Sequence, residues 1–94
     1  MQVVVRTYSG RGVDELVDAM EQREADVKEV ISGVPGFIHY AALRAGDGFV
    51  SVTACEDKAG TDESSTRAAA WVKENVSTPI DPPAIAEGGT FLQF

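Results

Sequence analysis

Residues 36–44 read Gly-Phe-Ile-His-Tyr-Ala-Ala-Leu-Arg, a run that is typical of a β-strand. Because alternate residues of a strand point to opposite faces of a sheet, this run presents two sets of side chains. One set is Phe37, His39, Ala41 and Leu43, and the other is Ile38, Tyr40, Ala42 and Arg44. Neither set is polar, as one of them should be if one face of the sheet met water. The strand therefore predicts a sheet whose two faces are both buried.

Two more strands are indicated by similar runs. Residues 49–56 form a strand-like segment, and the connecting residues Ala45-Gly46-Asp47-Gly48 favour the positive φ angles of a tight hairpin. The two strands should therefore pair antiparallel. Gln2 to Tyr8 is rich in β-branched residues and ends at the glycine-containing residues 9–12, which predict a turn.

Two helices are expected in the remaining segments. From Val13 to Val34, apolar residues recur with a period near 3.6 residues, which predicts one long amphipathic helix. The segment from Asp57 to Glu63 is polar and predicts a loop. A second helix is then expected to begin at one of the hydroxyl residues 64–66 and to run to about Val76.

The end of the chain supplies the last expected strand. Prolines at 79, 82 and 83 exclude regular structure across residues 78–87, and Thr90 to Phe94 alternates after two glycines. The element order is then β-α-β-β-α-β over a single domain, residues 1–94. This order predicts the α+β class with a ferredoxin-like, four-stranded antiparallel sheet and two helices on one face. Because the second face is also apolar, we expect a second copy to cover it in a homodimer.

Composition narrows the classes of partner. The chain has 8 basic and 15 acidic residues, and its net charge of −7 disfavours nucleic acid and anionic membrane surfaces as partners. No apolar run is long enough to span a membrane, and Met1 leads directly into a strand, which indicates a cytoplasmic protein. The single cysteine, Cys55, excludes an intrachain disulfide and a thiolate metal site, and we expect it to be a small buried residue.

The chain resembles a known superfamily in several of these features. They are the element order, the Gly36-Phe37 opening of the second strand, the Gly46-Asp47-Gly48 hairpin, and the segment Ala70-Trp71-Val72-Lys73-Glu74-Asn75 before Thr78-Pro79. Together they resemble the dimeric α+β barrel superfamily, in particular its antibiotic biosynthesis monooxygenase-like branch. The superfamily includes cofactor-free oxygenases of aromatic compounds, enzymes that degrade haem, and members without known activity.

The resemblance implies a cleft between the sheet and the helices, lined by Trp71 and by Asn75 one turn later. Many relatives carry a histidine where this chain has Asn75, and an amide is a poor iron ligand, so the departure argues against haem. The alternative interpretation is structural, with Trp71 as a core anchor and Asn75 hydrogen-bonded to nearby backbone.

Glu24 is the most unusual residue of the expected long helix, because it falls near the middle of the apolar stripe. Burial would raise the pKa of its carboxyl group and suit it to act as a general base. In the alternative interpretation the helix bends near residue 23, which leaves Glu24 at the mouth of the cleft and paired with Lys28.

Three residues of the second strand are weaker candidates. His39 would shuttle protons or pack at an interface, and Tyr40 would offer its phenol to the cleft or pack as an aromatic ring. Arg44 would steer an anionic substrate or pair with the acidic first helix.

Two functions from different classes are consistent with the sequence. The first is a cofactor-independent monooxygenase that acts on a small aromatic substrate and needs no metal or other cofactor. In that case Trp71 and Arg44 would bind the substrate, Asn75 would hydrogen-bond it or a developing oxyanion, and Tyr40, His39 or Glu24 would accept the proton. The second is a non-catalytic dimer that binds a small ligand or serves as a structural module.

Overall fold

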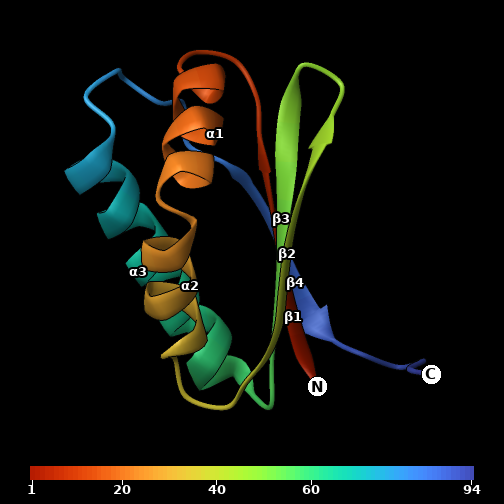
Figure 1. Cartoon of the computed structure of the whole chain (residues 1–94). Coiled ribbons are helices and arrows are strands. Elements are labelled where there is room, and N and C mark those ends of the chain that lie inside the picture. The colour runs from red at the N-terminus through yellow and green to blue at the C-terminus, as the bar shows by residue number, and fades with distance from the viewer.

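The computed structural model describes all 94 residues and has a four-stranded antiparallel sheet with helices on one face (Figure 1). The elements are β1 (Gln2–Tyr8), α1 (Val13–Gln22), α2 (Glu24–Ser32), β2 (Phe37–Ala45), β3 (Gly48–Cys55), α3 (Lys58–Asn75) and β4 (Ala84–Gly89). The strand order is β2-β3-β1-β4, and each neighbouring pair is antiparallel. The structure confirms the predicted α+β, ferredoxin-like fold. β1 has the predicted bounds, and β2 and β3 lie within one residue of theirs.

The expected long helix is interrupted, so the chain has three helices rather than two. Arg23 leaves the helical region with φ −118° and ψ 38° and separates α1 from α2. On one side of the break α1 packs on β3, whereas on the other side α2 packs on β2 and α3. The break lets the two segments follow different parts of the sheet, which one straight helix could not do.

The second expected helix, α3, begins earlier than predicted, at Lys58. The polar segment after Cys55 is its first two turns rather than a loop, and Gly60 and Thr61 are buried within it. A Cβ atom at Gly60 would collide with the backbone oxygen of Pro35 and with the Cys55 side chain. Gly60 is therefore present for close packing, although glycine is a weak helix former.

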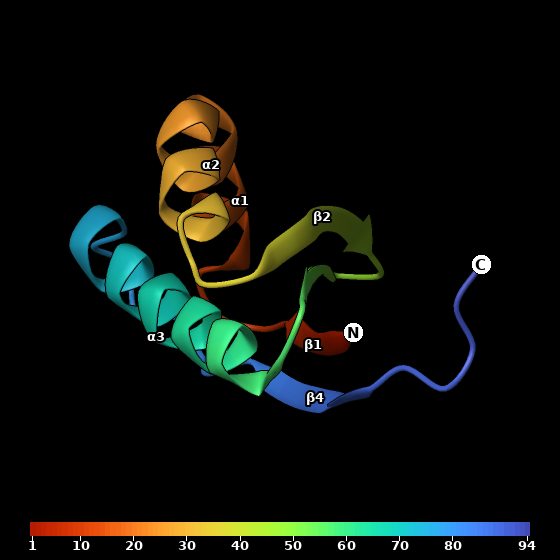
Figure 2. The same ribbon diagram turned by 90° about the horizontal axis from the view of Figure 1, so that it is seen from below.

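The fourth strand was predicted in the wrong place. β4 begins directly after Pro83 and pairs with β1 at the edge of the sheet, where strands tolerate a neighbouring proline and glycines. Thr90 to Phe94 is not a strand, and the side chain of Phe91 is 92% exposed. Figures 1 and 2 show this tail leading away from the sheet.

A β-bulge in β2 changes which residues share a face. Phe37 is paired with Cys55 and His39 with Ala54, so Ile38 is the extra residue. Phe37 therefore lies on the helix side with Tyr40, and Ile38 lies on the outer side with His39. The strict alternation predicted from the sequence placed Phe37 with His39 and was wrong at this point.

The outer face of the sheet is apolar and carries no helix. Figure 2 shows that the helices lie on one side of the sheet, and the strand pairing places every second residue of each strand on the side without helices. These outer residues include Val3, Val5, Leu43, Val50, Val52 and Ala54. The apolar second face predicted from the sequence is thus present, and no segment of this chain covers it.

The core lies between the sheet and the helices. Its central cluster is Tyr8, Val13, Leu16, Val17, Phe49 and Trp71. The rings of Tyr8 and Phe49 stack with centroids 4.6 Å apart. Gly12 is the residue directly before α1 and has φ 81°. A Cβ there would collide with Ile80 and with the Pro79 backbone. None of the helices has the length and apolar character needed to cross a membrane.

Candidate functional site

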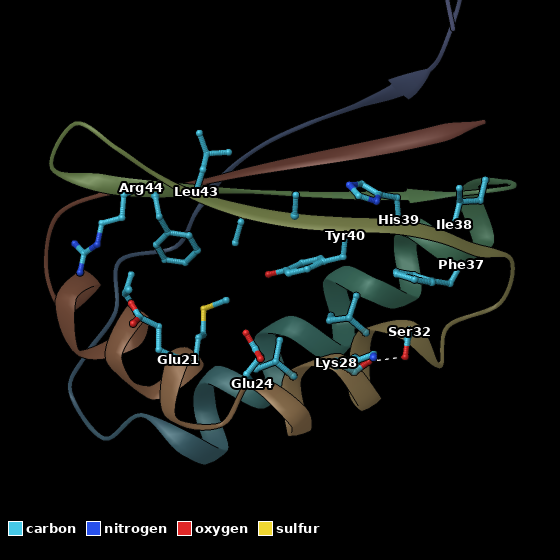
Figure 3. Close-up of a pocket in the computed structure, with 17 residues that line it drawn as sticks. Glu21, Glu24, Lys28, Ser32, Phe37, Ile38, His39, Tyr40, Leu43 and Arg44 are labelled. Atoms are coloured by element: carbon cyan, nitrogen blue, oxygen red, sulfur yellow. Dashed lines mark hydrogen bonds between the residues drawn. The ribbon is translucent and has the colours of Figure 1, made fainter. Parts of the chain in front are cut away.

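A cavity of about 580 Å³ lies between β2 and the helices α1 and α2 (Figure 3). This volume is within the range of small-molecule sites, about 300–1,000 Å³. Eleven of its 17 lining residues are hydrophobic. The other six are the polar residues Glu21, Glu24, Lys28, Ser32, His39 and Arg44, and Tyr40, which is counted with the hydrophobic residues, adds a phenol group. We call it the outer cavity, although it lies on the helix side of β2 and not on the outer face of the sheet.

Tyr40 is the aromatic residue whose phenol points from β2 into the outer cavity (Figure 3). Burial raises the pKa of this phenol, and the positive charge of Arg6 offsets the increase only in part. Tyr40 therefore stays protonated at neutral pH. In this state it can donate a hydrogen bond to an oxygen of a ligand but does not act as a base.

Glu24 lies on the first turn of α2, and its side chain faces the outer cavity from the side opposite Tyr40 (Figure 3). The helix break at Arg23 places it at the exposed border of the cavity rather than in the core. Its predicted ion pair with Lys28 is absent from the ion pairs of the structure. Glu24 is thus a carboxylate available to a ligand.

The other two candidate residues of β2, Arg44 and His39, differ in their orientation to the outer cavity. The Nη1 atom of Arg44 donates to Oδ1 of Asp14 at 3.0 Å, and both side chains are exposed. His39 borders the cavity, but its imidazole points to the opposite face of the sheet from the Tyr40 phenol (Figure 3). The structure therefore brings Tyr40, Glu24 and Arg44 to the outer cavity and turns the His39 ring away from it.

Trp71 and Asn75 do not border the outer cavity. The indole nitrogen of Trp71 donates to Oδ2 of Asp26 at 2.8 Å, and this bond connects α3 to α2. The amide nitrogen of Asn75 donates to the backbone oxygen of Trp71 at 2.9 Å, and its oxygen accepts a bond of 2.8 Å from Arg23. The polar atoms of both side chains therefore have partners within the fold.

A second, inner cavity of about 30 Å³ lies beside the outer one and has room for about one water molecule. The two cavities share the lining residues Met20, Val27, Ile31, Tyr40 and Phe49. Trp71 and Arg6 line the inner cavity only.

Arg6 is a charged residue that the sequence interpretation missed. It lies on β1 and is only 2% exposed. Its guanidinium donates to Oγ1 of Thr53 at 2.8 Å and to the hydroxyls of Ser65 at 3.0 Å and Ser64 at 3.4 Å. Its Nε atom has no partner, and no carboxylate lies within 4.0 Å of the side chain. A signal was present in the sequence, because Arg6 alternates with Val4 and Tyr8, which are both buried.

Comparisons with known proteins concern the fold of the whole chain. No protein-family model and no curated protein matches the sequence. Solved structures do match it, over almost the whole chain. The first is the monooxygenase from the gene ActVA-Orf6 of Streptomyces coelicolor in complex with nanaomycin D, with 23% identity and a TM-score of 0.65. That alignment covers 99% of this chain and 92% of the other.

Two further solved structures match the chain in fold. A mutant of MhuD with two manganese protoporphyrin IX molecules per active site has 19% identity and a TM-score of 0.65, covering 99% of this chain and 96% of the other. A mutant of SnoaB, a cofactor-independent oxygenase from Streptomyces nogalater, has 17% identity and a TM-score of 0.54, covering 99% and 93%. The chain has the antibiotic biosynthesis monooxygenase-like fold. The resemblance predicted from the sequence is confirmed at the level of the fold.

Because one protein with this fold was solved with a porphyrin, we tested whether the residues here suit haem. His39 is the only histidine of the chain, and its imidazole points away from the outer cavity (Figure 3). The cavity therefore offers no imidazole to a haem iron. No group of three or more histidine, cysteine, aspartate or glutamate side chains gathers elsewhere as a metal site.

Proposed function

We propose that this protein is a cofactor-independent monooxygenase that acts on a small aromatic substrate bound in the outer cavity. The observation that carries the proposal is the cavity itself. It is large enough for an aromatic ring, its walls are mostly hydrophobic, and the neutral phenol of Tyr40 points into it opposite the Glu24 carboxylate (Figure 3). The matches to a monooxygenase and to a cofactor-independent oxygenase of the same fold support it.

In the proposed reaction the substrate is an electron-rich phenol that reduces dioxygen directly. Glu24 accepts the phenolic proton, and Tyr40 donates a hydrogen bond to the resulting oxyanion. The carbanion form of the ring transfers its electrons to dioxygen and forms a carbon–oxygen bond as a hydroperoxide. Loss of water from the hydroperoxide then yields a quinone. One oxygen atom enters the product and the other leaves as water, so the phenol is oxidised and dioxygen is reduced.

We also propose that the working form is a homodimer. The outer sheet face, which includes Val5, Val50 and Val52, is apolar and carries no covering element. A second copy packed on this face would bury these side chains and enlarge a small core.

The test is a screen of small phenols that measures thermal stability and oxygen uptake together. We expect at least one phenol to raise the melting temperature and to consume oxygen. Glu24→Gln should lower the rate by at least about 100-fold, because general bases contribute factors of that size. Tyr40→Phe should also lower it by at least about 100-fold, the typical loss for one oxyanion donor.

Glu29→Gln is the matched control, because Glu29 is an exposed carboxylate of the same helix that does not border the cavity. It should leave the rate unchanged. If no phenol shifts the melting temperature or consumes oxygen, the monooxygenase proposal is wrong.

A second candidate is a dimer that binds a small ligand without catalysis. The observation that favours it is that Trp71 and Asn75, which the resemblance implies as site residues, use their polar atoms within the fold. Phenols that stabilise the protein without oxygen uptake would support this candidate over the enzyme.

A further inference from the structure

We propose that Arg6 binds the anionic oxygen of an aromatic ligand, and that this ligand is a phenol held as its phenolate. The ring would occupy the outer cavity, and its oxygen would point toward the inner cavity, where Arg6 lies. The inference rests on the proposed function in that it uses the same cavity, but it needs no reaction with oxygen.

The first step of the argument is the charge of Arg6. A guanidinium stays protonated in proteins, so a positive charge is buried beside β3 and α3. A buried charge is costly unless another charge compensates it. The groups that Arg6 contacts are the hydroxyls of Thr53, Ser64 and Ser65 and the phenol of Tyr8, and all of them are neutral. The surrounding hydrogen bonds orient the guanidinium without balancing its charge.

The second step asks whether the protein itself supplies the counter-charge. No carboxylate forms an ion pair with Arg6. The two tyrosines near it, Tyr8 and Tyr40, remain neutral because burial raises the pKa of each phenol despite the attraction of Arg6. The chain therefore contains no anion for Arg6, and its Nε–H group also lacks an acceptor. An external anionic oxygen would balance the charge of Arg6 and accept a hydrogen bond from its Nε–H group.

The third step concerns the route to Arg6. The inner cavity is lined by Arg6 and has room for about one oxygen-sized group, while Tyr40 and Phe49 border both cavities. A ligand ring in the apolar outer cavity would thus place a substituent between Tyr40 and Arg6. Tyr40 would donate a second hydrogen bond to the same oxygen.

The charges at the border of the outer cavity favour a phenol over a carboxylate. Glu21 and Glu24 lie there with one unpaired cation, Lys28, while Arg44 is paired with Asp14, and the whole chain has a net charge of −7. A carboxylate would be repelled before it reached Arg6. A phenol can enter as a neutral molecule and lose its proton inside, where Arg6 stabilises the phenolate.

The experiment measures binding of 4-nitrophenol without oxygen, because its phenolate is coloured and its ionisation is directly visible. The full chain should lower the apparent pKa of bound 4-nitrophenol by at least one unit, a tenfold preference for the phenolate. Its methyl ether, 4-nitroanisole, cannot ionise and should bind at least tenfold more weakly than the phenolate. A third probe, 4-nitrobenzoate, tests whether the site prefers a carboxylate to a phenolate.

Substitutions assign the effect to Arg6. Arg6→Met should weaken binding of 4-nitrophenolate at least tenfold and change binding of 4-nitroanisole less than twofold. Arg6→Lys keeps a positive charge and should retain a pKa shift of the same sign. Arg11→Gln removes an exposed arginine that borders neither cavity and should behave like the wild type.

The proposal is overturned if none of the probes binds, if the wild type leaves the pKa of 4-nitrophenol unchanged, or if Arg6→Met binds the phenolate as tightly as the wild type. If neither Arg6 variant folds, the wild-type titration decides. Tighter binding of 4-nitrobenzoate than of 4-nitrophenol overturns the choice of a phenol. Binding that depends on Arg6 without oxygen uptake by any phenol would refute the monooxygenase but support this inference. Oxygen uptake and phenolate binding that both survive in Arg6→Met would support the monooxygenase but refute this inference.

Discussion

Replacing Trp71 with phenylalanine tests whether this residue holds two helices together. Its indole nitrogen donates to the Asp26 carboxylate at 2.8 Å, and its side chain is only 7% exposed within the core cluster. Phenylalanine keeps an aromatic ring at the position but cannot donate this bond. Trp71→Phe therefore removes the polar connection between α3 and α2 and part of the apolar packing.

The expected loss can be divided into two contributions. A hydrogen bond to a charged group contributes about 1.5–3 kcal/mol, and because Asp26 is exposed we take the lower value, about 1.5 kcal/mol. The missing apolar atoms remove about 1–2 kcal/mol more. The free energy of unfolding should fall by about 3 kcal/mol. Because the urea dependence of small proteins is about 1–3 kcal/mol per M, the midpoint of urea unfolding should fall by about 1–3 M. The measurement is circular dichroism at one fixed protein concentration.

A double-mutant cycle isolates the hydrogen bond. Asp26→Ala alone should cost about 1.5 kcal/mol, and adding it to Trp71→Phe should cost nothing further. Asp18→Ala is the matched control, because Asp18 is an exposed acid of α1 without an ion pair, and it should change stability by less than about 0.5 kcal/mol. Effects of Trp71→Phe and Asp26→Ala that add within about 0.5 kcal/mol would refute the connection between the two helices.

Two further outcomes can be measured on the same protein. Tyr8 and Tyr40 are the only tyrosines, and burial raises the pKa of both, so above about pH 10 the unfolded chain loses protons that the folded chain keeps. The free energy of unfolding does not depend on these groups below that pH. Above it, the free energy should fall by up to about 1.4 kcal/mol per pH unit for each of the two tyrosines. Ultraviolet absorbance of tyrosinate that appears while the helical signal is intact would contradict this. Val52→Asp places a charge on the outer sheet face and should convert the proposed dimer to monomers in sedimentation at low micromolar concentration, while Thr66→Asp, on an exposed position of α3, should not. A wild-type monomer at that concentration would remove the basis of the dimer proposal.

The strands with a clear β-strand sequence pattern could be predicted from the sequence. β1 is a short β-branched run, and the hairpin between β2 and β3 turns at Gly46, which has φ 59°. These signals are local, because the turn and the strand pattern depend on neighbouring residues. The apolar second face of the sheet was also evident from β2 alone.

The errors have causes that lie outside the local sequence. The helix break at Arg23 follows from packing against different strands, and the apolar period continues through it. Gly60 looks like a loop residue until Pro35 and Cys55 are seen to press against it. β4 follows a proline-rich segment and is only two alanines, an isoleucine, a glutamate and two glycines, so its pairing with β1 rather than its composition makes it a strand.

The candidate site was only partly accessible to sequence analysis. Tyr40 and Glu24 were named, and the structure places both at the outer cavity. Trp71 and Asn75 lie one turn apart on α3, but this spacing says nothing about their partners, which are Asp26 of α2 and Arg23 at the break before it. Arg6 was missed because the strand was judged by its majority of β-branched residues.

The bulge at Ile38 is a residue that the pairing of β2 does not need. Its loss by a three-nucleotide deletion would leave Phe37 opposite Cys55 and His39 opposite Ala54, so both side chains would keep their faces. A gene lineage could thus discard this half-exposed isoleucine and straighten the edge of the sheet while the wall of the binding chamber stayed as it is.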